Sequence, residues 1–375
     1  MTKQYRSFFH FLLLVGLLAL VPVMVKATHI VGGEIELQYL GAGRPFTHRV
    51  NLNLYFDQLT GNPGAEDATV VLGIFRKRDN VFLSGLELQK TGSSQIASTL
   101  PNCTQASQIT RVIRYGLDVT LNAQAFNDPG GYYISWERCC RNGGISNITS
   151  PSGAASAFYL EFPAISATSP ALYNSSPVFK APKGDYICLN RPFVFDFSAT
   201  DADGDSLVYS MATPYNGFSD RNNSNPGVGT ATVTSQFFPG PYPVIGWNAG
   251  YSATNSIPGS VPLQVNPRTG ILSVNASRAG LFVFSVEVVE YRRGVAIGRV
   301  RRDYQLQAID CPVNDAPVLL MKAQGASSFY RPGTILTLND TDKACLTLFV
   351  TDPNANQRIS ITNGSGLLLG LAITP

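Results

Sequence analysis

The stretch THRVNLNLYFD (residues 47–57) alternates apolar and polar side chains along its length. Successive side chains of an extended chain point to opposite sides, so this alternation predicts a β-strand with one buried face. Similar runs, rich in β-branched and aromatic residues, follow at short intervals with turn-forming sequences between them. No stretch keeps a helical 3.6-residue period. We therefore predict an all-β fold of the β-sandwich type. The later runs are TVVLGIFRK, NVFLSGLEL, QITRVIRYGLDVTL and GGYYISWERC, separated by TGNPGAED, TLPNCT and NDPGG.

The composition agrees with many short strands and gives no support for nucleic-acid binding. The chain has 375 residues, of which 44% are hydrophobic, and its 34 glycines and 24 prolines recur at short intervals. This length is sufficient for several domains with real cores. The formal net charge is only +3, and there is no basic tail or positively charged domain to attract a phosphate backbone.

The N-terminus carries the pattern of a secretory signal. Lys3 and Arg6 precede an apolar run over residues 8–25, and the following VKA supplies small residues where a signal peptidase cuts. We expect residues 1–27 to be removed, so that the mature chain begins at Thr28. The alternative is an uncleaved membrane anchor. No other apolar run is long enough to cross a bilayer.

Composition shifts divide the rest of the chain. Residues 28–165 are predicted to form an N-terminal β-sandwich domain, and the polar, Pro/Ser-rich residues 166–177 a linker. A second β-sandwich domain follows over 178–312, in which two alternating runs meet at RRG (292–294) and predict a hairpin. Residues 313–375 are predicted to form a third domain that is incomplete, because the chain stops inside an apparent strand. We expect the chain to be a fragment of a longer protein.

Two segments repeat each other. NSSPVF (174–179) aligns with NDAPVL (314–319), and SATDADGDSLVYS (198–210) aligns with FVTDPNANQRISI (349–361). Each unit thus opens with N-x-x-P-V and later carries Thr-Asp. Two related β-domains in tandem are the simplest interpretation.

The acidic stretch ATDADGDSLVY (199–209) is the main candidate site. Asp201, Asp203 and Asp205 occupy alternate positions, so their carboxylates point to one side of an extended chain, and Gly204 allows the chain to bend around them. Carboxylates that converge repel one another unless a cation joins them, and an all-oxygen site suits Ca²⁺. The stretch is not an EF-hand, because Gly and Glu are missing from the sixth and twelfth positions. The alternative is a solvated loop whose Asp side chains bond their own backbone.

Six cysteines follow the signal, and an oxidising compartment makes disulfides the default. No pair has C-x-x-C spacing, so a zinc site is not expected. Cys139 and Cys140 are adjacent, and adjacent residues of a strand face opposite ways, so we expect them to pair with different partners, with Cys103 a natural partner for one. A redox-active vicinal disulfide is the alternative. Cys188 and Cys311 lie near the two ends of the second domain and are predicted to bond, closing a loop of over 120 residues, which contributes roughly 4–5 kcal/mol on the chain-entropy model.

Two further stretches resemble the cadherins and cadherin-like bacterial domains: NDAPV (314–318) their interdomain linker, and LQVNPRTGILSV (263–274) their strand–turn–strand signature. In that family calcium lies between consecutive domains and stiffens the array. The resemblance implies that the three Asp residues above face the first junction. It also implies that four residues serve the second junction, namely Asn314, Asp315, Asp352 and Asn354. The acidic residues that the family carries after the strand–turn–strand unit are absent here, where the chain reads NASRAG.

A closer resemblance covers most of the mature chain. The stretches ATHIVGGEI, YISWERCCRNGGISNI (133–148), NSSPVF, SATDADGDSLVY and EYRRGVAIGRVRRDYQLQAIDC resemble the N-terminal region of gliding-motility-associated, type IX-secreted bacterial surface proteins. This implies secretion to the extracellular face of the outer membrane of a Gram-negative gliding bacterium. Members of the family usually end in a C-terminal sorting domain, which this chain does not contain.

The residues favour a binding or structural role over catalysis. Only three histidines occur, His10, His29 and His48, and none has the sequence context of a catalytic triad. We expect a non-enzymatic adhesive or structural protein, possible partners being other surface proteins or a surface polysaccharide, with no nucleic-acid partner. The alternative is a carbohydrate-active protein, either a binding module or a glycoside hydrolase. Five arginines around RRG (Arg292, Arg293, Arg299, Arg301 and Arg302) suggest either an acidic-polysaccharide patch or, as we favour, a solvated hairpin that resists edge-to-edge aggregation.

Overall fold

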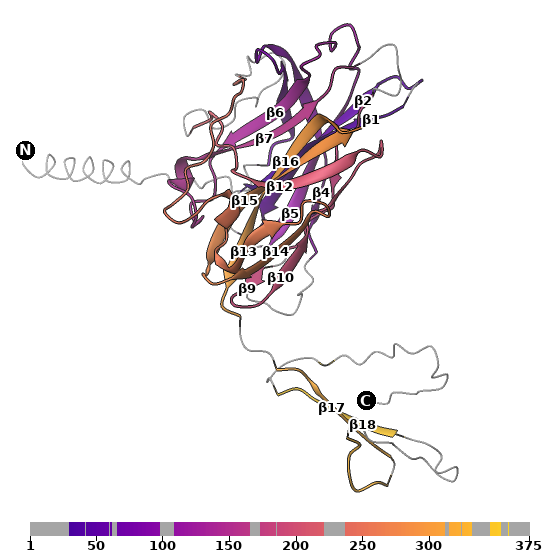
Figure 1. Cartoon of the computed structure of the whole chain (residues 1–375), viewed down its shortest axis with the longest axis vertical. Coiled ribbons are helices and arrows are strands. Elements are labelled where there is room, and N and C mark those ends of the chain that lie inside the picture. Colours follow the sequence, from indigo (N-terminus) through magenta and orange to yellow (C-terminus); the bar gives the residue numbers. More distant parts are fainter. Residues whose placement is uncertain are drawn as a thin grey trace, which may run out of the picture. The chain divides into compact units, whose positions relative to one another are not determined.

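The computed structural model describes residues 30–41, 43–59, 61, 66–97, 109–165, 173–184, 186–220, 237–311, 315–323, 325–331, 346–353 and 359. Within these residues the regular structure consists of strands and two short 3-10 turns, η2 (Pro151–Gly153) and η4 (Ala253–Asn255). The predicted all-β fold is therefore confirmed (Figure 1). The predicted signal over residues 1–27 lies outside the described residues.

Most strands belong to one large sheet. Its order is β1 (Ile30–Tyr39), β2 (His48–Asp57), β5 (Thr110–Val119), β4 (Phe82–Gln95), β3 (Thr69–Arg76), β6 (Tyr132–Cys139), β7 (Ala155–Phe162), β16 (Val295–Ile309), β15 (Gly280–Arg292) and β12 (Ser206–Ala212). The short β9 (Ile187–Cys188) runs parallel to β16. A further pairing of β1 with β16, at Gly33 opposite Asp303, closes the sheet on itself. Smaller sheets are β10 (Phe193–Asp196), β14 (Ile271–Ala276) and β13 (Gly259–Val265), then β11 (Ala199–Thr200) with β8 (Val178–Phe179), and β17 (Val318–Ala323) with β18 (Leu346–Thr351).

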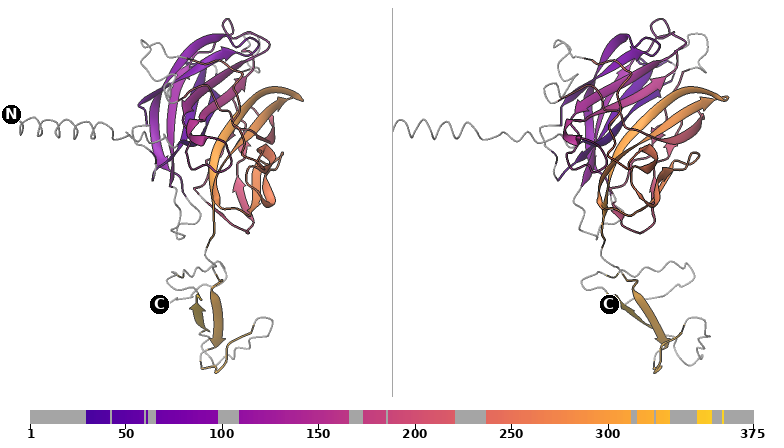
Figure 2. Two further views of the ribbon diagram at one scale, coloured as in Figure 1. Left: turned by 90° about the vertical axis from the view of Figure 1, so that its left-hand side faces the viewer. Right: turned by 60° about the vertical axis from the view of Figure 1, so that its left-hand side comes forward.

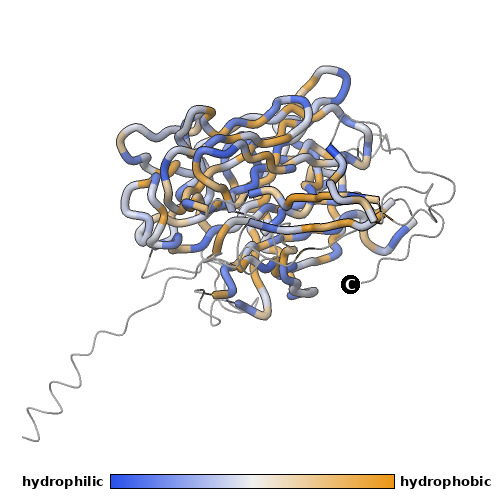
Figure 3. Tube along the Cα trace, turned by 90° about the horizontal axis from the view of Figure 1, so that it is seen from below, coloured by the Kyte–Doolittle hydropathy of each residue, from blue (hydrophilic) through white to orange (hydrophobic). Residues whose placement is uncertain are grey.

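The alternation seen in the sequence sets which side of each strand is buried. In β2, Val50, Leu52 and Leu54 are almost completely buried in the core. Hydrophobic and hydrophilic stretches follow one another closely along the chain trace (Figure 3). Strand β1 differs, because its first eight residues are buried on both faces. One face packs into the core through Ile35 and Leu37. On the other face, Arg302 binds Glu34, and the Asn side chains of β2 bind Glu36.

Residues up to Asp310 form one compact unit, and Cys311–Pro375 form a second. The predicted division at 166–177 therefore does not separate two compact units, whereas the predicted boundary at 312/313 lies close to the observed one. The physical reason is that β16 is buried from Val300 to Leu306 with one brief interruption. It pairs with β15 of the predicted second domain and also with β1 and β7 of the predicted first domain. The long β15–β16 hairpin, orange in Figure 2, lies against the N-terminal strands. The Tyr55 and Tyr304 rings meet edge to face with centroids 5.4 Å apart.

The internal repeat is present in the strand pairing. In the first unit Val178 of N-x-x-P-V lies opposite Thr200 of Thr-Asp. In the second unit Val318 of N-x-x-P-V lies opposite Thr351 of Thr-Asp. The two copies thus pair in the same register, each within its own unit, which agrees with the repeat found in the sequence.

Candidate metal centre

The acidic loop joins β11 to β12 and folds around Asp201. One oxygen of Asp201, Oδ1, accepts hydrogen bonds from the backbone N–H groups of Asp203 (2.9 Å) and Asp205 (3.0 Å). Gly204 has φ of 79°, a left-handed conformation that glycine adopts without strain. An acidic side chain that bonds its own backbone was the alternative to a calcium site, and Oδ1 of Asp201 does form such bonds. The other oxygen, Oδ2, is buried and has no hydrogen-bond partner among the described residues.

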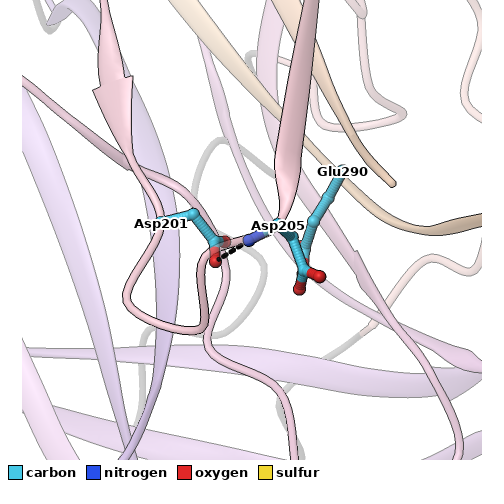
Figure 4. Close-up of side chains that lie close together, drawn as sticks. All are labelled: Asp201, Asp205 and Glu290. Carbon is cyan, nitrogen blue, oxygen red and sulfur yellow. Dashed lines mark hydrogen bonds between the residues drawn. The ribbon is translucent and has the colours of Figure 1, made fainter. Parts of the chain in front are cut away.

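A residue that the sequence analysis did not select completes the cluster. Glu290 lies near the end of β15, opposite Leu207 of β12, and its side chain is 0% exposed. Neither of its carboxyl oxygens has a well-formed hydrogen bond within the described part of the chain. The cluster consists of Asp201, Asp205 and Glu290 (Figure 4). Each residue contributes one carboxylate oxygen, and these three oxygens lie within 4.8 Å of one another. No local pattern marks Glu290; only the pairing of β12 with β15 brings it to the loop.

Burial and the charges of neighbouring carboxylates disfavour the ionised forms of Glu290 and Asp201. Burial raises the pKa of Glu290 to about 8, and the charges of Asp201 and Asp205 add to the effect, while the amide of Asn174 opposes it. The pKa of Asp201 is also raised, first by burial and then, in part, by the charges of Asp205 and Asp203. A positive charge placed among these carboxyl groups would favour the ionised form of Glu290.

Arg292 supplies one positive charge at the edge of the cluster. Its Nε donates to Asp205 Oδ1 at 2.9 Å, and its Nη2 donates to Asp205 Oδ2 at 2.5 Å and to Asn174 Oδ1 at 2.6 Å. With all groups ionised, three carboxylates and this one guanidinium leave a formal charge of −2. A divalent cation would balance that charge.

Asp203, the third member of the predicted trio, lies apart from this cluster. Its Oδ2 accepts a hydrogen bond from the backbone N–H of Ser175 at 2.6 Å and lies 3.6 Å from Arg292 Nη2. It therefore ties the acidic loop to the N-x-x-P-V segment, and Glu290 takes the place that the sequence analysis gave to Asp203.

The predicted second calcium site falls partly outside the described residues. Asn314 and Asn354 lie outside them. Asp315 is exposed just before β17, and the partly buried Asp352 directly follows β18. The shared register of the two repeats makes Asp352 the counterpart of Asp201.

The cysteines correct one prediction. Cys139 and Cys140 are bonded to each other, not to separate partners, with their Cα atoms 3.0 Å apart across a cis peptide bond. The alternation argument failed because β6 ends at Cys139, so Cys140 lies outside the strand. Cys188 and Cys311 are both in the disulfide-bonded state, and the parallel register places Cys188 opposite Ile309. Their bond to each other remains a prediction, and Cys103 lies outside the described residues.

The arginines around the RRG turn are mostly neutralised by the protein itself. Arg299 lies 3.1 Å from Glu161, and Arg301 lies 2.7 Å from Glu287, with its guanidinium 4.1 Å above the ring of Tyr215. Arg302 is fully buried and forms an ion pair with Glu34, and Arg292 forms one with Asp205. Of these five arginines, Arg293 at the turn is exposed and has no ion pair with another residue in the described part of the chain. This arrangement does not favour an acidic-polysaccharide patch.

No helix in the described part of the chain combines the length and apolar character needed to cross a membrane. In comparisons with known proteins, no family model, no curated protein and no solved structure matches the chain.

Proposed function

We propose that this chain is part of a secreted, non-enzymatic surface protein with an adhesive or structural role, and that its first unit is stabilised by Ca²⁺ bound to Asp201, Asp205 and Glu290. The calcium proposal rests on the fully buried carboxyl group of Glu290, which faces two other carboxylates and whose oxygens have no well-formed hydrogen bond within the described residues. The surface location rests on the signal pattern and on the resemblance to gliding-motility-associated proteins. The second repeat, with Asp315 and Asp352, is the candidate for a related site.

The geometry suits calcium. Ca²⁺ takes oxygen ligands at about 2.3–2.6 Å, so two of its ligands lie at most about 5 Å apart. The three carboxylate oxygens meet this limit at 4.8 Å. Calcium also tolerates irregular coordination that includes water, whereas Mg²⁺ demands a near-ideal octahedron at shorter distances.

A catalytic role for the same carboxyl groups is not favoured. A raised pKa is typical of a general acid, but such a group must reach the atom that it protonates. The side chain of Glu290 is 0% exposed, so a substrate has no access to it. A cation could reach the cluster from the side of Asp201 and Asp205, which are partly exposed, and would offset the repulsion that raises the pKa of Glu290.

Thermal unfolding of the full chain in Ca²⁺, in Mg²⁺ and in EDTA tests the proposal. We expect Tm to rise in millimolar Ca²⁺, because a ligand at a hundredfold excess over its Kd stabilises the folded state by roughly 2.7 kcal/mol. Mg²⁺ should produce a smaller rise. Because the ion must displace the proton of Glu290, the calcium effect should be larger at pH 8 than at pH 6.

Two variants locate the ion. Glu290→Gln removes a ligand charge with little change in shape and should abolish the calcium effect. Asp203→Asn, the matched control, alters an acidic residue of the same loop that lies outside the cluster and should keep most of the effect. Equal Tm values for the wild type in Ca²⁺ and in EDTA would reject the calcium site, and loss of the effect in Asp203→Asn alone would place the ion elsewhere in the loop.

Carbohydrate binding is a second candidate function. It is favoured by a separate cavity of about 240 Å³ that is lined by carboxylate and amide side chains of β1 and β2.

A further inference from the structure

One face of the sheet formed by β1, β2, β5 and β4 is polar, although the opposite face belongs to the hydrophobic core. Glu34 and Glu36 alternate with buried apolar residues in β1, and Asn51 and Asn53 do the same in β2. The antiparallel register places Glu34 opposite Asn53 and Glu36 opposite Asn51. Because residues directly opposite each other point to the same side of a sheet, these four side chains form one patch, here called the β1–β2 polar patch.

A cavity of about 240 Å³ opens over the β1–β2 polar patch. Phe179, Ala181 and Pro182 form one wall, contributed by the segment that follows the N-x-x-P-V motif, and Arg114 of β5 lies opposite Asn53 in the strand register. Most of the polar groups therefore come from paired strands, which hold them in fixed positions. Tyr55, Thr91, Ile96, Val112 and Arg302 complete the lining.

The amide groups hold Glu36 in place and leave it able to accept further hydrogen bonds. Asn51 Nδ2 donates to Glu36 Oε2 at 3.1 Å, and Asn53 Nδ2 donates to Glu36 Oε1 at 2.8 Å and to Glu34 Oε1 at 3.1 Å. Each oxygen of an ionised carboxylate can accept about two hydrogen bonds. Glu36 is 8% exposed and so retains acceptor capacity toward the cavity.

Glu34 is already neutralised by a buried partner. Arg302 donates from Nε to Glu34 Oε2 at 2.9 Å and from Nη2 to Glu34 Oε1 at 3.0 Å, and the hydroxyl of Tyr55 donates to Glu34 Oε1 at 2.8 Å. Among the described residues, the charged groups that line the cavity are thus two carboxylates and the guanidinium groups of Arg302 and Arg114. Their formal charges cancel, so the cavity has little net charge with which to select an ion.

From these features we infer that the cavity binds a neutral, polyhydroxylated ligand, namely a sugar unit of a glycan or surface polysaccharide. Hydroxyl groups can donate to Glu36 and accept from Arg114, while Phe179, Val112 and Pro182 offer apolar surface to the C–H groups of a sugar ring. Rigidly placed polar groups that fix the orientation of a ligand beside apolar surface are typical of small-molecule sites. The volume is below the roughly 300–1,000 Å³ of drug-sized pockets, which fits one sugar unit. This inference is independent of the calcium site.

Binding of single sugars to the full chain tests the inference. The probes are neutral monosaccharides (glucose, galactose, mannose, rhamnose and N-acetylglucosamine), with glucuronic acid as the charged comparator, measured by saturation-transfer NMR and titration. We expect at least one neutral sugar to bind with a Kd in the millimolar range, as suits so small a ligand. Because the ligand is uncharged, Kd should be the same at low and high salt.

Three variants place the binding in the cavity. Glu36→Gln should weaken binding at least tenfold, whereas the matched control Glu87→Gln, on the same polar face of β4 but outside the cavity, should bind as the wild type does. Ala181→Trp fills the cavity from an exposed position, so it should abolish binding without disturbing the core. No binding by any neutral sugar, binding of glucuronic acid alone, or unchanged binding by Ala181→Trp would overturn the inference. The same titrations with Glu290→Gln in EDTA separate a failure of this site from a failure of the calcium site.

Discussion

His48 shows how burial alone can set the charge state of a residue. Its side chain is 0% exposed and lies near the rings of Tyr39 and Tyr173, with centroid distances of 5.5 and 6.0 Å. Nδ1 lies 2.8 Å from the hydroxyl of Thr47, while Nε2 has no hydrogen-bond partner within the described residues. Burial lowers the pKa of His48 to about 4, so the folded protein holds this imidazole neutral over most of the acidic range.

The depressed pKa predicts a loss of stability in acid. In the unfolded chain His48 should titrate near 6.5. The folded state prefers the neutral form, so its contribution is fully present above pH 6.5 and declines as the pH falls toward about 4. The loss should approach about 3 kcal/mol. Urea unfolding at pH 7 and at pH 4.5 should show a smaller difference for His48→Gln than for the wild type, since that variant cannot titrate. Equal differences would assign the acid sensitivity to other groups.

At the scale of the element, the β15–β16 hairpin carries both Glu290 and Arg292 to the candidate metal centre. Arg292 pairs with Val295, so the turn consists of Arg293 and Gly294, as the RRG sequence predicted. Both residues have positive φ, 52° and 80°. These values are typical of a type I′ turn, whose twist matches that of the paired strands. Arg293 is therefore held in a conformation that residues other than Gly, Asn and Asp rarely adopt.

Substitutions at this turn should change stability through the backbone alone. A Cβ added at Gly294 would meet nothing within 4 Å, so Gly294→Ala should cost about 1–2 kcal/mol from the left-handed conformation. Arg293→Asn should be neutral or stabilising, because Asn tolerates positive φ. Gly153→Ala is the control: Gly153 also faces open space, but its φ is not positive. The free energy of unfolding of each variant is measured by denaturant titration. If Gly294→Ala lowers it by no more than Gly153→Ala does, the turn assignment is contradicted.

At the scale of the whole molecule, the strand order requires residues 30–310 to fold together. β16 pairs with β1 and β7, so the two halves of this unit share one sheet and one core. A fragment of residues 28–311, which retains Cys311, should unfold cooperatively at nearly the Tm of the first unit in the full chain. A fragment of residues 28–165 should not unfold cooperatively, because β1 and β7 would expose the surfaces that β16 covers. Calorimetry of the two fragments measures this, and a cooperative transition in 28–165 would restore the two-domain division.

The sequence by itself determined the features that depend on neighbouring residues. Alternation within runs such as 47–57 predicted strands because side-chain direction in an extended chain has period two. The RRG turn and the two N-x-x-P-V/Thr-Asp repeats were also visible locally, and their pairing agrees with the structure. Two members of the candidate metal centre, Asp201 and Asp205, were found in the same way, because they lie in one short loop.

The tertiary structure decided everything that joins distant segments. Glu290 reaches Asp205 only through the register of β12 against β15, and the β1–β2 polar patch gains its neutralising partner only because Arg302 lies 268 positions from Glu34. Glu34 and Glu36 in β1, and Asn51 and Asn53 in β2, are visible in the sequence as alternating polar residues. Nothing in either stretch predicts that the two pairs lie opposite each other. Which strand pairs with which, and in what register, follows from the apolar surface that the whole chain can bury. That quantity is a property of the complete packing, and no single stretch of sequence contains it.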